Sequence, residues 1–203
     1  MKTTKLITLI QISIFAAIST IVMFFEIPVF FLPNFYKLDF SDAIVLISGF
    51  SLGPLAGVVT QGVKILLSLL IKGSSSLGIG QFANFITGIS LILPSALIYK
   101  KYRTFKGACL SMLAGVSSLV FISACLNYFM LIPIYEKLFL FEETTIISLA
   151  NAINPFITDR LTFVLFGVCP FNLLKGILVC TLALLLYKKL TSLINKISSA
   201  NKK

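Results

Sequence analysis

The sequence predicts an all-α integral membrane protein in which six helices form one bundle, with residues 1–203 as a single domain. Hydrophobic residues make up 58% of the chain and charged residues only 12%, whereas soluble proteins carry about 25% charged residues. The mean hydropathy of +1.02 favours helices in lipid, because a helix satisfies its backbone polar groups within its own segment. Long apolar runs separated by short polar or basic segments are the third observation that favours this fold.

The composition leaves little material for catalysis. Histidine is absent and the chain has only seven carboxylates, which disfavours a metal site or general acid–base chemistry. The four cysteines are isolated from one another, as is typical of small buried apolar residues. The net charge of +10 indicates membrane topology rather than nucleic-acid binding. We therefore expect no catalytic residue, metal, cofactor or nucleic-acid partner.

The first predicted span covers residues 6–25. This run is too long for the apolar core of a typical signal peptide, and no small-residue cleavage site follows it. The segment 27–42 comes next, rich in aromatic residues and with two prolines, and we expect it to lie at the membrane interface or to cover a cavity. Small residues at four-residue spacing would let another helix approach the first span closely, within the bundle or from a partner; they are Ser13, Ala16, Ala17 and Thr20.

A break at residues 51–54, with the sequence SLGP, separates the next two predicted helices. Glycine and proline together disfavour a continuous helix. We therefore predict a short second helix at 42–50 and a third at about 55–71. The remaining spans are predicted at 81–99, 107–135 and 167–190, with a glycine- and serine-rich loop at 72–80 and a semi-polar loop at 136–159.

The distribution of basic residues predicts the orientation of the bundle. With the N-terminus in the cytoplasm, six spans place both termini and most lysines and arginines on the cytoplasmic side, as the positive-inside rule requires. All seven carboxylates are then assigned to the external side, and the predicted location is a cell membrane that the chain crosses several times; the resemblance described below implies the bacterial plasma membrane. The cytoplasmic set is Lys2, Lys5, Lys100, Lys101, Arg103, Lys106, Lys188, Lys189, Lys196, Lys202 and Lys203.

Five polar residues from four predicted helices fall in the outer half of the bundle: Lys64, Asn84, Asn127, Asn172 and Lys175. Three of them lie at a similar depth, roughly 10–12 Å from the outer helix ends. Each lysine alone could extend toward the interface, and each asparagine alone could bond a neighbouring helix. Together they favour a binding pocket open to one side rather than a conducting path. Amides and ammonium groups suit a neutral ligand rich in carbonyl oxygens and ring nitrogens.

Four segments of the chain carry a family resemblance: KLDFSDAIVLISGFSLGPLAGVVTQGVK at 37–64, GQFANFITG at 80–88, LNYFMLIPIY at 126–135 and PFNLLKG at 170–176. Together they resemble the riboflavin-specific S component of energy-coupling factor (ECF) vitamin transporters. The match spans nearly the whole chain. The last of these segments is the most specific to the riboflavin proteins.

This resemblance implies a six-helix binding subunit that captures riboflavin from outside. Its partners would be a transmembrane coupling subunit and two cytoplasmic ATPases, and it would topple in the membrane to release the vitamin. Asn127, Asn172 and Lys175 match positions that hold the isoalloxazine ring, and Asn84 matches a position near the ligand. Leu38 and Lys64 complete the candidate binding set. The loop before Asp39 would be the lid, and the first helix, with its small residues, would face the coupling subunit.

Three alternatives stay open at this stage. The protein could be an S component for another vitamin, a standalone facilitator or channel, or a small membrane enzyme. An enzyme would need a histidine, carboxylate or activated serine at depth. The sequence contains no GxxxxGK[ST] segment, so ATP hydrolysis would have to come from partners.

Overall fold

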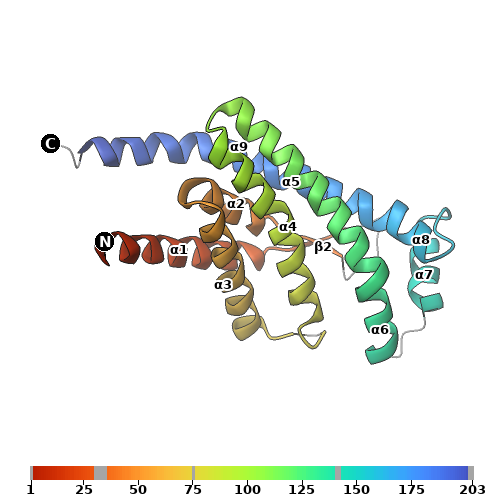
Figure 1. The fold of residues 1–203 in the computed structure, drawn as a ribbon. Coiled ribbons are helices and arrows are strands. Elements are labelled where there is room, and N and C mark those ends of the chain that lie inside the picture. Colours follow the sequence, from red (N-terminus) through yellow and green to blue (C-terminus); the bar gives the residue numbers. More distant parts are fainter. Residues whose placement is uncertain (1, 30–35, 75, 140–142, 201–203) are drawn as a thin grey trace.

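The computed structural model describes residues 2–29, 36–74, 76–139 and 143–200 (Figure 1). Helices dominate, and β1 pairs with β2 in a short antiparallel ladder that places Ile27 opposite Leu38. Two π-helical turns, η1 and η2, interrupt longer helices. The elements are α1 (Lys2–Met23), β1 (Ile27–Pro28), β2 (Lys37–Leu38), α2 (Ser41–Leu52), α3 (Pro54–Lys72), α4 (Ile79–Lys101), α5 (Phe105–Leu126), η1 (Asn127–Leu131), α6 (Ile132–Phe139), α7 (Glu143–Asn151), α8 (Arg160–Phe163), η2 (Val164–Val168) and α9 (Cys169–Ala200).

Five helical segments in the described ranges are long and apolar enough to cross a membrane. The predicted second span corresponds to α2, which has only 12 residues where a straight crossing needs about 20. Within the described ranges, the structure therefore supports a multi-pass helical membrane protein in which the apolar helix α2 is too short for a straight crossing. The five long segments are Leu6–Met23, Pro54–Lys72, Ile79–Lys101, Phe105–Leu138 and Arg160–Leu186.

The predicted break between the second and third helices is confirmed. Gly53 has a φ of 104°, which favours glycine, and Pro54 occupies the first turn of α3, where its missing N–H costs nothing. The two helices then approach closely, since a Cβ on Gly57 would lie 2.9 Å from the Cα of Gly49. This hairpin places α2 inside the protein.

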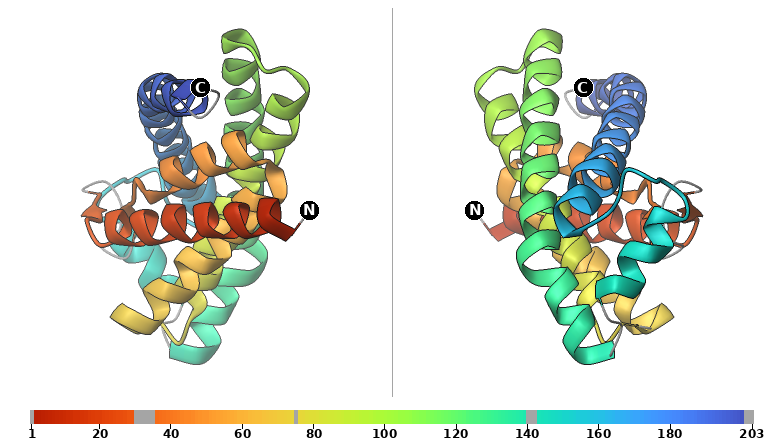
Figure 2. Two further views of the ribbon diagram at one scale, coloured as in Figure 1. Left: turned by 90° about the vertical axis from the view of Figure 1, so that its left-hand side faces the viewer. Right: turned by 90° about the vertical axis from the view of Figure 1, so that its right-hand side faces the viewer.

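Helix α2 is the central element of the bundle. It packs against α1, α3, α4 and α9, and it lies between α1 and α9 in the views of Figures 1 and 2. Leu46 and Ile47 of α2 join Leu91 and Leu119 in a buried apolar cluster. An element covered on every side can be short and can still carry polar groups, because protein rather than lipid surrounds it.

The predicted loop at 136–159 contains regular structure. Helix α6 continues to Phe139, and α7 follows at Glu143–Asn151. Ile146 and Ala150 of α7 are buried in a second apolar cluster with Ile132 and Phe163. The sequence prediction of a semi-polar loop missed this helix, whose nine residues are short for a clear periodic pattern.

Candidate ligand-binding site

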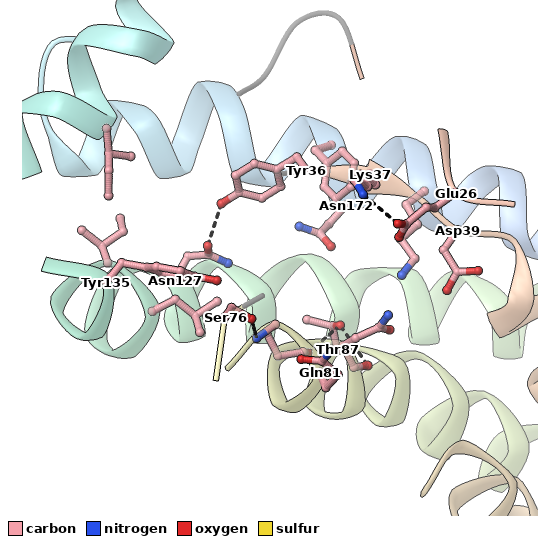
Figure 3. Close-up of a pocket in the computed structure, with 18 of the residues that line it drawn as sticks. Glu26, Tyr36, Lys37, Asp39, Ser76, Gln81, Thr87, Asn127, Tyr135 and Asn172 are labelled. Carbon is pink, nitrogen blue, oxygen red and sulfur yellow. Dashed lines mark hydrogen bonds and ion pairs between the residues drawn. The ribbon is translucent and has the colours of Figure 1, made fainter. Parts of the chain in front are cut away.

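A cavity of about 720 Å³ lies among β2, α3, α4, η1, α7 and α9. Figure 3 shows its polar side chains projecting from different elements toward a common space. Asn84, Asn127, Asn172 and Lys175, all expected from the sequence to bind a ligand, line this cavity. The tertiary structure therefore brings four of the six candidate binding residues together.

Asn127 and Asn172 are held in the same way on opposing helices. Asn127 Nδ2 donates to the backbone oxygen of Ser123 at 2.8 Å, and Asn172 Nδ2 donates to that of Val168 at 2.9 Å. Asn127 begins η1, and Val168 ends η2. A π-helical turn interrupts the regular hydrogen-bond pattern of the α-helical backbone. The Asn127 amide bonds a backbone oxygen in the turn before η1, and the Asn172 amide bonds the last backbone oxygen of η2. Each amide is thereby oriented and retains bonding capacity for a ligand.

Lys175 reaches the cavity wall from α9 as part of a buried charge cluster. Its Nζ donates to Asp42 Oδ2 at 2.8 Å, while Lys64 Nζ donates to Asp42 Oδ1 at 2.6 Å and to Ser41 Oγ at 2.9 Å. Asp42 is 1% exposed. The sequence placed this carboxylate among the external polar groups, whereas the structure encloses it within the protein, where two buried lysines neutralise it.

Lys64 and Leu38 are placed differently from the other candidate binding residues. Lys64 is completely buried, and neither residue lines the cavity. Lys64 contacts Asp42 within the bundle, and Leu38 of β2 is half-buried against the second apolar cluster. The lysine does not extend to the interface, because its carboxylate partner lies within the bundle.

The α4 wall offers an acceptor that lacks a partner. Asn84 Oδ1 is buried and forms no hydrogen bond within the described part of the chain. Thr87, one turn along, also lines the cavity and donates to the backbone oxygen of Ala83 at 2.9 Å. A buried acceptor without a partner costs about 1–3 kcal/mol, so this wall suits a ligand that carries hydroxyl donors.

Aromatic side chains form another wall. The rings of Tyr36 and Phe171 meet edge to face with centroids 5.3 Å apart, and Tyr36 contacts Phe163 at 6.1 Å. The Tyr36 hydroxyl donates to Asn127 Oδ1 at 2.8 Å. Burial raises the pKa of Tyr36, so its hydroxyl remains a donor at neutral pH. Such a wall suits a flat ring with polar groups at its edge.

Three charged side chains gather at another part of the cavity wall. Glu26, just beyond α1, accepts a hydrogen bond from Lys37 of β2 at 2.7 Å and another from Lys72 of α3. Partial burial alone would raise the pKa of Glu26, but the hydrogen bonds from the two lysines outweigh it and hold this pKa below its ordinary value. The carboxylate therefore joins three elements beside the cavity.

The small residues of α1 divide into two groups. Ala16 and Thr20 are buried within the bundle, and Thr20 Oγ1 donates to the backbone oxygen of Ala16 at 2.8 Å. Ser13 and Ala17 are exposed. Of the four small residues predicted to allow close helix approach, Ala16 and Thr20 pack within the protein, and Ser13 and Ala17 remain on its surface.

Comparison with known proteins identifies the family. The family described as "ECF transporter, substrate-specific component" matches residues 7–187. The chain belongs to this family. The S component is 34% identical to the riboflavin transporter RibU of Staphylococcus aureus over 93% of both chains. It is 33% identical to the riboflavin transporter FmnP of Bacillus subtilis, over 97% of this chain and 98% of the relative.

A solved structure described as "Structure and mechanism of the S component of a bacterial ECF transporter" has the same fold. The TM-score is 0.74 and the sequence identity 30%, and the match covers 96% of this chain and 99% of the other. The protein is thus a transporter component rather than an enzyme.

Sequence reasoning missed several residues that line the cavity or contact its wall: Glu26, Tyr36, Asp39, Asp42 and Thr87. The predicted covering segment at 27–42 contains Tyr36 and Asp39 without singling them out, and a specific signal existed for Asp42. Two lysines inside predicted spans require counter-charges, and an aspartate at the start of the predicted short second helix could supply one. Glu26 and Thr87 have no such charge partner in the sequence pattern, so nothing local points to either side chain.

Proposed function

We propose that this S component binds riboflavin in the cavity and delivers it to an ECF module made of a transmembrane coupling subunit and two cytoplasmic ATPases. The observation that carries this proposal is the convergence of Asn127, Asn172 and Lys175 on a cavity that also has an aromatic wall. The relatives named as riboflavin transporters match nearly the full chain.

The chemistry of the cavity complements riboflavin at both ends. One edge of the isoalloxazine ring carries two carbonyl oxygens on either side of an N–H group. The amides of Asn127 and Asn172 provide donors and acceptors for this edge, and Lys175 adds donors for a ring nitrogen or carbonyl. The ribityl hydroxyls complement Asn84 Oδ1 and Thr87 on the α4 wall. A cavity of about 720 Å³ falls within the range typical for small-molecule sites.

We further propose that the chain crosses the plasma membrane with both termini in the cytoplasm, and that α2 is the sixth membrane element. The start of α1 and the end of α9 lie at one end of the molecule (Figure 1). The basic residues of the α4–α5 connection are exposed, as the cytoplasmic surface requires. The exposed pair Ser13 and Ala17 then remains available to the coupling subunit, as small residues allow close helix approach.

Titration of the purified protein with riboflavin in detergent tests the binding function. We expect saturable quenching of flavin fluorescence with one site per chain, because the aromatic wall contacts the ring. Lys175→Ala should lose this binding while the protein stays folded. Leu174→Ala, at an exposed neighbouring position, is the matched control and should bind like the wild type. A folded wild-type protein that does not bind riboflavin would refute the proposal and favour another vitamin.

A further inference from the structure

A continuous buried chain of polar groups begins at Asp39, directly after β2, and links it to α2, α3 and α9. Asp39 accepts hydrogen bonds from the backbone N–H and the hydroxyl of Ser41, both at 2.7 Å. Ser41 accepts from Lys64, and Asp42 accepts from both Lys64 and Lys175. All five residues are buried. Two carboxylates thus balance two ammonium groups within the bundle.

The two lysines of this cluster are not equivalent. Lys175 lines the cavity, whereas Lys64 is completely buried and does not. They divide the oxygens of Asp42, with Lys64 on Oδ1 at 2.6 Å and Lys175 on Oδ2 at 2.8 Å. Lys64 does not line the cavity, yet it binds one of the two oxygens of the carboxylate that neutralises Lys175.

Sharing a carboxylate changes the field at the cavity wall. One negative charge between two ammonium groups compensates each of them only in part. Without Lys64, Asp42 would compensate Lys175 alone and would reduce the positive potential that the ligand meets. Asp39 also acts electrostatically on Lys175, but its hydrogen bonds come from Ser41, whereas the direct ion pair of Lys175 is with Asp42. Coulomb interactions among such buried groups are poorly screened.

We propose that Lys64 is a positioning residue that acts on the ligand through Asp42 and Lys175. It holds Asp42 in place and limits how far this carboxylate neutralises Lys175, so that Lys175 presents positive charge to the carbonyl oxygens and ring nitrogens of the ligand. This inference rests on the proposed function, since it needs riboflavin as the probe. It assigns to Lys64 an electrostatic effect without ligand contact.

Two substitutions of Lys64 separate charge from shape. Lys64→Met keeps nearly the same volume and removes the charge, whereas Lys64→Arg keeps the charge and changes the shape. We expect Lys64→Met to weaken riboflavin binding by about tenfold and Lys64→Arg to bind more tightly than Lys64→Met. Lys106→Met removes an exposed lysine and is the control for net charge, with unchanged affinity. A packing role for Lys64 predicts the reverse order of the two variants and would overturn the proposal.

The visible absorption of bound riboflavin gives a second measurement that does not depend on the arginine variant folding. The bands of a flavin respond to positive charge near its ring. We expect the bands of riboflavin bound to Lys64→Met to shift relative to the wild-type complex, with unchanged bands for Lys106→Met. Weaker binding with an identical spectrum would show a purely structural role and would overturn the proposal. If the wild type does not bind riboflavin, the proposed function itself fails, which is a distinct outcome.

Discussion

Tyr36 donates its hydroxyl hydrogen to Asn127 Oδ1 across 2.8 Å, between residues 91 positions apart in the sequence. Tyr36 directly precedes β2, in the segment expected to cover the cavity, and Asn127 begins η1 at the opposite wall. The bond therefore connects the covering segment to a residue proposed to recognise the ring. The same bond orients the Asn127 amide and anchors the Tyr36 side chain.

Removing this bond should speed the release of riboflavin. Tyr36→Phe keeps the ring contacts with Phe163 and Phe171 but loses the hydroxyl, and one such hydrogen bond contributes about 1 kcal/mol, which is roughly fivefold. Stopped-flow fluorescence after dilution measures the dissociation rate. Tyr102→Phe, at an exposed position near the end of α4, is the matched control. A dissociation rate equal to that of the wild type would show that Tyr36 does not hold the covering segment.

The amide of Asn172 should be essential for affinity. Asn172→Leu keeps a similar volume but would leave polar groups of the ligand edge without partners, and we expect riboflavin to bind about 10–100-fold more weakly. Isothermal titration calorimetry measures this loss. Thr181→Val, at an exposed position on the same helix, should have no effect. Binding at wild-type strength by Asn172→Leu would remove Asn172 from the site.

Asp42 should be the most sensitive residue for stability. Asp42→Ala leaves two buried ammonium groups without their shared counter-ion, and breaking a buried ion pair typically costs about 3–5 kcal/mol. We expect a large drop in the thermal unfolding temperature in detergent, even without riboflavin. Asp159→Ala, at an exposed helix cap, should change it far less. Equal melting temperatures for the two variants would contradict a central role for the cluster.

Acid should weaken the contact of Glu26 with Lys37 and Lys72. The pKa of Glu26 lies below its ordinary value of 4.5 in the folded protein, so its carboxylate stabilises the fold above that value. This contribution is lost as the pH falls through the lowered pKa. Riboflavin release should therefore accelerate below about pH 4.5, and it should do so less in Glu26→Gln, which is already neutral. Identical pH profiles for the wild type and Glu26→Gln would rule out this contact as a restraint on release.

The sequence by itself determined the class of the protein, the main helices and several of the polar residues that line the cavity. Long apolar runs, the break before Pro54 and the spacing of Asn127, Asn172 and Lys175 along their helices are local properties, and local properties can be read from one segment at a time. An intramembrane lysine or asparagine is conspicuous because its cost in lipid must be offset.

Only the tertiary structure decided which polar residues line the cavity and which contact one another. Lys64 and Lys175 are both lysines within predicted spans, and both contact Asp42 in the structure. Of the two, Lys175 lines the cavity and Lys64 does not. Tyr36 became part of the site through a bond to a residue 91 positions away. Contacts between distant segments depend on how the helices pack, and no local pattern of residue types encodes that packing.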